Sequence, residues 1–115
     1  MVGNAPLAHG VREFEVSVSD QSQLRALRDW LHGVPAVSVT LRSGVPGPGE
    51  QGALDYLTVL ASSGGLITAI KIFPEFLRSR RAGLTIRVKA KGKEVTLNAT
   101  NVDDVMPILR KVLDE

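Results

Sequence analysis

Three glycines, Gly47, Gly49 and Gly52, have the G-x-G-x-x-G spacing of a turn that binds dinucleotides. That turn requires a strand that runs directly into the first glycine and an acidic residue roughly twenty residues later, near the end of the next strand. Here residues 43–46 intervene, and at that later position the pattern is still helical. No Lys-Ser or Lys-Thr pair follows, as a phosphate-binding P-loop would need. We therefore predict no nucleotide site and interpret Gly52 as a structural residue that turns the loop into a helix.

The other residues capable of catalysis or metal binding are isolated from one another in the sequence. His9 lies in a predicted tail and His32 at a predicted helix end, and neither has an acidic cluster beside it. The adjacent Asp103 and Asp104 are typical of helix capping rather than of acid–base chemistry. The chain has no cysteine, which excludes disulfides, thiolate metal sites and a cysteine nucleophile. We predict no catalytic residue, no metal and no cofactor, and hence a protein that is not an enzyme.

The composition is that of one globular domain. Of the 115 residues, 43% are hydrophobic and 23% charged, and aromatic residues reach only 4%, so the core must be aliphatic. Residues 1–10 lack periodicity and are expected to form a flexible tail, whereas residues 11–115 form a single α+β domain. The first residues lack the pattern of a signal peptide, and the absence of cysteine suits a reducing compartment. We expect a cytoplasmic protein.

The periodicity of apolar residues predicts the element order β-α-β-α-β-β-α. The predicted strands are residues 12–19, 36–41, 84–90 and 95–99. The predicted helices lie between Asp20 and Gly33, over residues 53–81, and after a cap at Asp103 or Asp104. The last two strands alternate around Lys91-Gly92, which is typical of a hairpin. Since right-handed crossovers make neighbouring strands parallel, we predict a four-stranded mixed sheet packed by three helices.

The predicted helix over residues 53–81 is the longest element. Gly64-Gly65 in its interior predicts a bend, and Pro74 predicts a kink or a boundary. The small side chains around the two glycines favour a very close contact with another element, and a homodimer is one option. Its apolar part, residues 53–73, raises the alternative of an effector that acts on membranes after activation, although polar residues interrupt it too often for a spanning helix at rest.

Half of the lysines and arginines fall within one short basic run, which consists of Arg78, Arg80, Arg81, Arg87, Lys89, Lys91 and Lys93. Clustered cations suit phosphate groups or an acidic protein surface. The run has no aromatic residue for stacking on bases, so nucleic-acid binding is the weaker alternative. We predict a partner-binding surface made of Arg78, Arg80, Arg81, Arg87 and Lys89, together with the loop residues Pro46, Pro48, Glu50 and Gln51.

A series of short motifs extends over nearly the whole chain, from Phe14 to Leu113: LRALRDWL, PGEQGALD, SSGG, FLRSRR and TIRV. Their order resembles the bacterial effector-associated constant component family, small proteins encoded beside peptidase and NTPase modules in predicted conflict systems. The most specific segments are residues 48–55, Gly64-Gly65 and residues 77–81, and none is a catalytic signature. The resemblance implies a non-enzymatic accessory or adaptor that works with an effector such as a caspase-like or trypsin-like peptidase. It carries over no functional residue.

Overall fold

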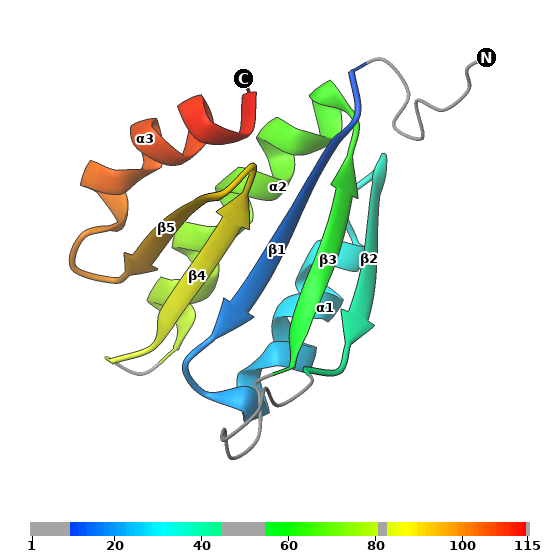
Figure 1. The fold of residues 1–115 in the computed structure, drawn as a ribbon. Coiled ribbons are helices and arrows are strands. Elements are labelled where there is room, and N and C mark those ends of the chain that lie inside the picture. The colour runs from blue at the N-terminus through cyan, green and yellow to red at the C-terminus, as the bar shows by residue number, and fades with distance from the viewer. Residues whose placement is uncertain (1–9, 45–54, 81–82, 115) are drawn as a thin grey trace.

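The computed structural model describes residues 10–44, 55–80 and 83–114, which form an α+β domain (Figure 1). The strands are β1 (Arg12–Val18), β2 (Val37–Arg42), β3 (Tyr56–Ala61), β4 (Thr85–Ala90) and β5 (Lys93–Asn98). The helices are α1 (Leu24–His32), which follows the short 3₁₀ turn η1 (Gln21–Gln23), α2 (Ser63–Ser79) and α3 (Val102–Asp114). The α+β class is confirmed.

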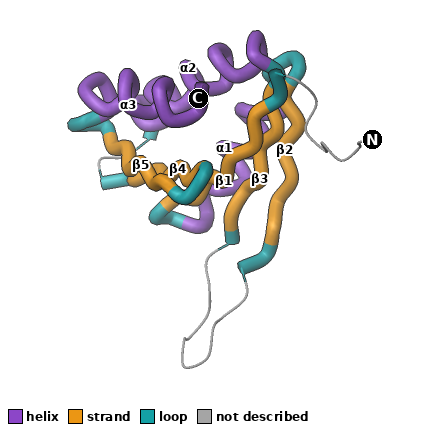
Figure 2. Tube along the Cα trace, turned by 45° about the horizontal axis from the view of Figure 1, so that its top comes forward, coloured by secondary structure: helices purple, strands orange, loops and turns teal. Residues whose placement is uncertain are grey.

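The five strands form one sheet in the order β2-β3-β1-β4-β5, and every neighbouring pair is antiparallel. The prediction of a four-stranded mixed sheet is therefore wrong. The predicted crossover from β1 to β2 exists, but β3 lies between these two strands and pairs with both, so no parallel neighbours arise. All three helices cover one face of the sheet, and no described helix covers the other, which is called the open face below (Figures 1 and 2).

The additional strand comes from the segment that the periodicity assigned to the long helix. Residues 56–61 alternate strictly, with Leu57, Val59 and Ala61 buried and the residues between them half-buried. A short apolar run fits both a strand and a buried helical turn, and the β-branched Thr58 and Val59 favour the strand. One helix over residues 53–81 is therefore wrong, because a strand and a shorter helix share that segment.

Ser62 separates the two elements by capping α2. Its side-chain oxygen accepts a hydrogen bond from the backbone N–H of Gly65 at 3.2 Å, which satisfies one of the free donors of the first turn. Gly64 and Gly65 thus begin the helix, and the predicted bend at these glycines is wrong. Pro74 lies inside α2, which continues through it to Ser79.

The close contact predicted for the small residues is made within the chain. A Cβ atom added at Gly65 would lie 2.7 Å from the carbonyl oxygen of Ala36 and 3.0 Å from that of Pro35, whereas one at Gly64 would meet nothing within 4 Å. Gly65 therefore lets the start of α2 pass directly over the segment that leads into β2. The small residues are thus used for intramolecular packing at this point, and they do not by themselves indicate a homodimer.

The core lies between the sheet and the helices. Alternate residues of the strands are buried on this side, among them Phe14, Val16 and Val18 of β1. The hairpin of β4 and β5 is confirmed, since Lys91 and Gly92 both have positive φ angles, 53° and 78°, as a two-residue type I′ turn requires.

No helix among the described residues is long and apolar enough to cross a membrane. The segment 53–73, which carried the membrane alternative, does not form one apolar helix. Its described part divides into β3 and the first turns of α2.

We expect Gly65→Ala to destabilise the fold by about 1–3 kcal/mol, because the new methyl group overlaps the Ala36 carbonyl and the backbone must shift. The matched control is Gly64→Ala, which adds the same methyl group where nothing lies within 4 Å. We expect it to change stability by no more than about 0.5 kcal/mol. Urea unfolding followed by Trp30 fluorescence measures both. Equal effects of the two substitutions would contradict the proposed close approach.

Candidate interaction surfaces

The basic residues predicted as one contact surface lie on two opposite sides of the sheet. Arg78 lies in the last turn of α2 and Arg80 directly after it, on the helical side. Arg87 and Lys89 are exposed in β4 and alternate with residues buried beneath the helices, so their side chains lie on the open face. The structure therefore does not bring these four residues into one surface. The remaining predicted contact residues, Arg81, Pro46, Pro48, Glu50 and Gln51, lie outside the described residues, as does Gly52.

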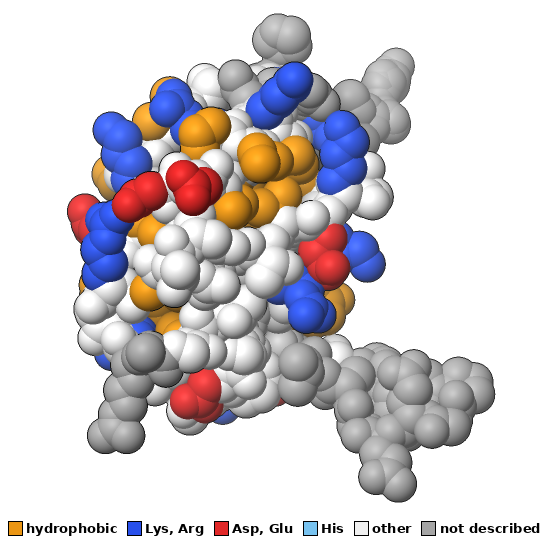
Figure 3. All heavy atoms as spheres, turned by 90° about the vertical axis from the view of Figure 1, so that its left-hand side faces the viewer, with side chains coloured by type: hydrophobic (Ala, Val, Ile, Leu, Met, Phe, Trp, Pro, Cys, Tyr) orange, Lys and Arg blue, Asp and Glu red, His pale blue; other side chains and the backbone are white. Residues whose placement is uncertain are grey.

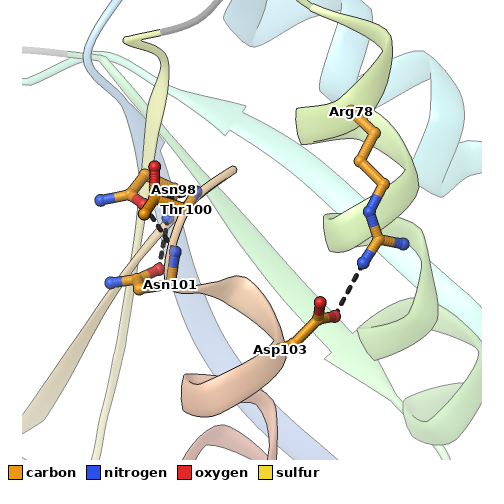
Figure 4. A network of polar contacts seen from close by, with 5 residues as sticks. All are labelled: Arg78, Asn98, Thr100, Asn101 and Asp103. Atoms are coloured by element: carbon orange, nitrogen blue, oxygen red, sulfur yellow. Dashed lines mark hydrogen bonds and ion pairs between the residues drawn. The ribbon is translucent and has the colours of Figure 1, made fainter.

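Arg78 connects α2 to α3. Its Nη2 atom donates to a carboxylate oxygen of Asp103 at 2.7 Å, and both side chains are more than half exposed (Figure 4). Such an exposed ion pair contributes about 0–1 kcal/mol to stability. Asp103 and Asp104 lie in the first turn of α3, where their charges favour the positive end of the helix, and neither precedes the helix as its cap. The charge of Arg78, one of the predicted contact residues, is thus already paired within the chain.

Arg80 lies against aromatic rings. The guanidinium carbon is 4.4 Å from the ring centre of Phe76 and 5.8 Å from that of Trp30, and the two rings meet edge to face at 5.2 Å. Phe76 is fully buried and Trp30 half-buried, so Arg80 holds the end of α2 against α1. Sequence reasoning missed this role, because Arg80 and Trp30 are far apart in the chain and no periodicity relates them.

A hollow of about 500 Å³ lies beside Arg80. It is lined by Ser19, Asp20, Gln23, Ser79, Arg80, Gly83 and Leu84. At its rim the Ser22 hydroxyl and the Ser22 backbone N–H both donate to the carboxylate of Asp20, which lowers the pKa of Asp20 below its ordinary value. The stabilisation from this charged cap is present above the ordinary pKa of an aspartate and is lost as the pH falls through the lowered pKa.

The base of the loop between β2 and β3 is held by Gln21 and Asp55. The Gln21 amide accepts from the Asp55 backbone N–H at 2.9 Å and donates to the Asp55 carbonyl at 3.4 Å, while the Asp55 carboxylate accepts from the Gly44 N–H at 3.2 Å. Asp55 is the last residue of the motif PGEQGALD. The contacts of Asp55 are therefore structural, because they join Gly44 and the start of β3 to η1.

The open face of the sheet carries charges of both signs. Glu15 of β1 is opposite Lys89 of β4, and Arg87 lies 3.6 Å from the carboxylate of Glu94 on β5. A shallow hollow of about 190 Å³ lies among these residues, with Tyr56 and Ser17 at its border. On the side of α3 and β5, basic and acidic side chains are likewise mixed around apolar ones (Figure 3). Neither of these two surfaces favours nucleic-acid binding, which needs a continuous positive field.

The outer edge of β5 is blocked by a side chain. The amide of Asn101 accepts from the backbone N–H of Asn98 at 2.8 Å and donates to the carbonyl of Thr96 at 3.2 Å, so it takes the place of a neighbouring strand. The Asn98 side chain in turn accepts from the N–H groups of Thr100 and Asn101 (Figure 4). The motif NATN, residues 98–101, could have indicated this turn, but sequence reasoning did not use it.

The residue types that bind metal ions are dispersed among the described residues. No three His, Cys, Asp or Glu residues among them are grouped as metal ligands would be. His32 is exposed, and within the described part of the chain its side chain has no hydrogen-bond or ion-pair partner. What the structure offers is a set of surfaces, namely an open sheet face of mixed charge and two sheet edges.

A family model described as Effector Associated Constant Component 1 matches residues 16–113. The chain belongs to this family. The match covers all nine elements except the start of β1 and the end of α3, and it confirms the resemblance seen in the motifs. No curated protein and no solved structure gives a significant match. The family description indicates association with an effector and assigns no reaction.

We expect Arg80→Ala to destabilise the protein by about 1 kcal/mol or more, because the guanidinium and its stem cover Phe76 and Trp30. The substitution should also alter the fluorescence emission of Trp30, the only tryptophan. Arg78→Ala is the control, since it removes an exposed pair worth about 0–1 kcal/mol and leaves the rings covered. Thermal unfolding and emission spectra test both. An unchanged spectrum for Arg80→Ala would contradict the stacking role.

Proposed function

We propose that this protein is a non-enzymatic accessory component of a bacterial conflict system, which binds an effector and regulates it or couples it to a sensor. The observation that carries the proposal is membership of an effector-associated family over residues 16–113. The partner we propose is a caspase-like or trypsin-like peptidase, or an NTPase module, which the resemblance implies. We do not propose that this protein itself acts on membranes.

The open face of the sheet is the best candidate for the docking surface. No described helix covers it, and Arg87, Lys89, Glu15 and Glu94 are all exposed on it. Alternating charges on a flat surface favour a partner with a complementary arrangement and reject others by like-charge contacts. The arginines at the end of α2 are less available, because Arg78 is paired with Asp103 and Arg80, directly after the helix, is stacked on the rings.

We expect Arg87→Glu combined with Lys89→Glu to weaken binding to the effector encoded by the neighbouring gene at least about tenfold, because two favourable charge contacts become repulsive. Arg78→Glu is the matched control on the opposite side, and we expect it to change the dissociation constant by less than about threefold. Isothermal titration calorimetry with purified proteins gives both values, and unfolding midpoints check that each variant is folded.

Three outcomes distinguish the alternatives. Loss of binding only with Arg78→Glu would move the docking surface to the helical side. Equal binding by all variants would exclude both charged surfaces. Absence of any complex between the native protein and peptidases or NTPases encoded beside it would contradict the accessory role itself.

A further inference from the structure

The strand β2 is an edge of the sheet whose outward backbone groups have no partner among the described residues (Figures 1 and 2). The N–H of Ser62 donates to the carbonyl of Ala36 at 3.1 Å, which makes this a hydrogen-bonded pair of the antiparallel ladder. Such pairs alternate along antiparallel strands. Ser38, Thr40 and Arg42 therefore bond to β3, and the N–H and C=O groups of Val37, Val39 and Leu41 face outward.

The described residues protect the other edge of the sheet and not this one. At β5, the side chain of Asn101 bonds the outward C=O of Thr96 and the outward N–H of Asn98, and Lys93 and Glu94 place charges at the start of the strand. β2 has none of these features. From Val37 to Leu41 it contains no charged residue and no proline, and its only charged residue, Arg42, is the last. An uncharged edge of this kind is a template for pairing with another strand.

We propose that two copies of the protein pair through β2, antiparallel, across a twofold axis that passes between Val39 and Val39 of the partner subunit. Residues directly opposite in an antiparallel pair lie on the same face, so Val37 faces Leu41 of the partner subunit and Val39 faces Val39 of the partner subunit. On the open face Ser38 is opposite Thr40 of the partner subunit. The three outward residues of each copy then bond to one another, and the two sheets become one.

Complementarity of charge and polarity favours a second copy as the occupant. In this register each apolar residue of β2 meets an apolar residue, each small polar residue meets a small polar one, and Arg42 of the partner subunit is opposite Ala36, so no like charges meet. A hollow of about 390 Å³, lined in part by Ala36, Ser38 and Leu60, lies at this end of the edge and leaves room for the stem of that arginine. The next register, centred on Thr40, would place Val37 opposite Ser43 of the partner subunit and lose one apolar pair.

The first test is Val39→Pro, which removes an outward N–H and leaves the hydrogen bonds to β3 intact, so the strand tolerates it at an edge. We expect the dimer dissociation constant to rise at least about tenfold. The matched control is Thr96→Pro, which makes the same change at the outward position of the blocked edge β5 and should leave dimerisation unchanged. Sedimentation equilibrium from about 1 to about 500 µM covers the range, since edge pairing buries a small area and gives weak dimers.

The second test uses exposed side chains that the monomer does not need, and it also fixes the register. Ser38→Lys combined with Thr40→Lys places like charges opposite each other twice in the proposed dimer, so we expect monomers. Ser38→Glu combined with Thr40→Lys places opposite charges there, and we expect the dimer to return. Thr40→Lys alone separates the two registers, because the new lysine faces Ser38 of the partner subunit in the proposed dimer but faces a second lysine in the register centred on Thr40. We expect this single variant to remain dimeric.

A native protein that remains monomeric at the highest concentration would overturn the proposal. So would a dimer that persists in Val39→Pro and in the double-lysine variant, since it would use another surface. If Val39→Pro fails to fold, the two charge variants decide. Binding of an effector segment that depends on Val39, without any dimer of this chain, would assign the edge to a different occupant and also overturn the proposal.

Discussion

The pairing of β1 with a neighbour on each side is the interaction on which the rest of the structure depends. Glu15 and Val16 are paired with β3 on one side and with β4 on the other. Because β1 begins the described fold and β4 lies about seventy residues later, its pairing with β4 closes most of the chain into one loop, a contact that costs entropy before it gains stability. Phe14, Val16 and Val18 offset that cost by entering the core beneath the helices.

The parts of the fold that could be predicted are those in which one local signal acts alone. β1 and the β4–β5 hairpin alternate strictly, and Lys91-Gly92 suits the turn that joins them. The boundary between β3 and α2 within residues 53–81 could not be predicted, because an alternating apolar run is followed by a helical one with no proline between them. Ser62, which caps α2, is also compatible with a polar position inside a helix. The prediction of parallel strands was wrong for a different reason, since β3 was not recognised and lies between β1 and β2, which are therefore not neighbours.

The candidate site was less predictable than the fold, because a linear run of charge says nothing about faces. Arg78 and Arg87 are close in sequence, but a helix, a loop and the alternation of a strand place them on opposite sides of the sheet. The contact of Arg80 with Trp30 is a tertiary contact that no spacing rule contains. The hydrogen bonds of Asn101 to the edge of β5 are local, and the motif NATN could have indicated them. Composition could indicate that the surface is charged, and only the structure could indicate which charges are already used.

Pairing through the edge strand β2 would determine how the open faces of two copies are arranged. An added strand continues the sheet in its own plane, so the uncovered faces of two copies joined through β2 lie on the same side. Dimerisation therefore leaves Arg87 and Lys89 accessible and presents each twice. A dimer with two equivalent docking faces binds a dimeric or clustered effector with an effective concentration in the millimolar range, which strengthens weak contacts by about 10² or more when the geometry permits both to form. The proposed docking through a shallow face of mixed charge and the proposed dimer are thus compatible, because dimerisation would supply the avidity that such a face lacks.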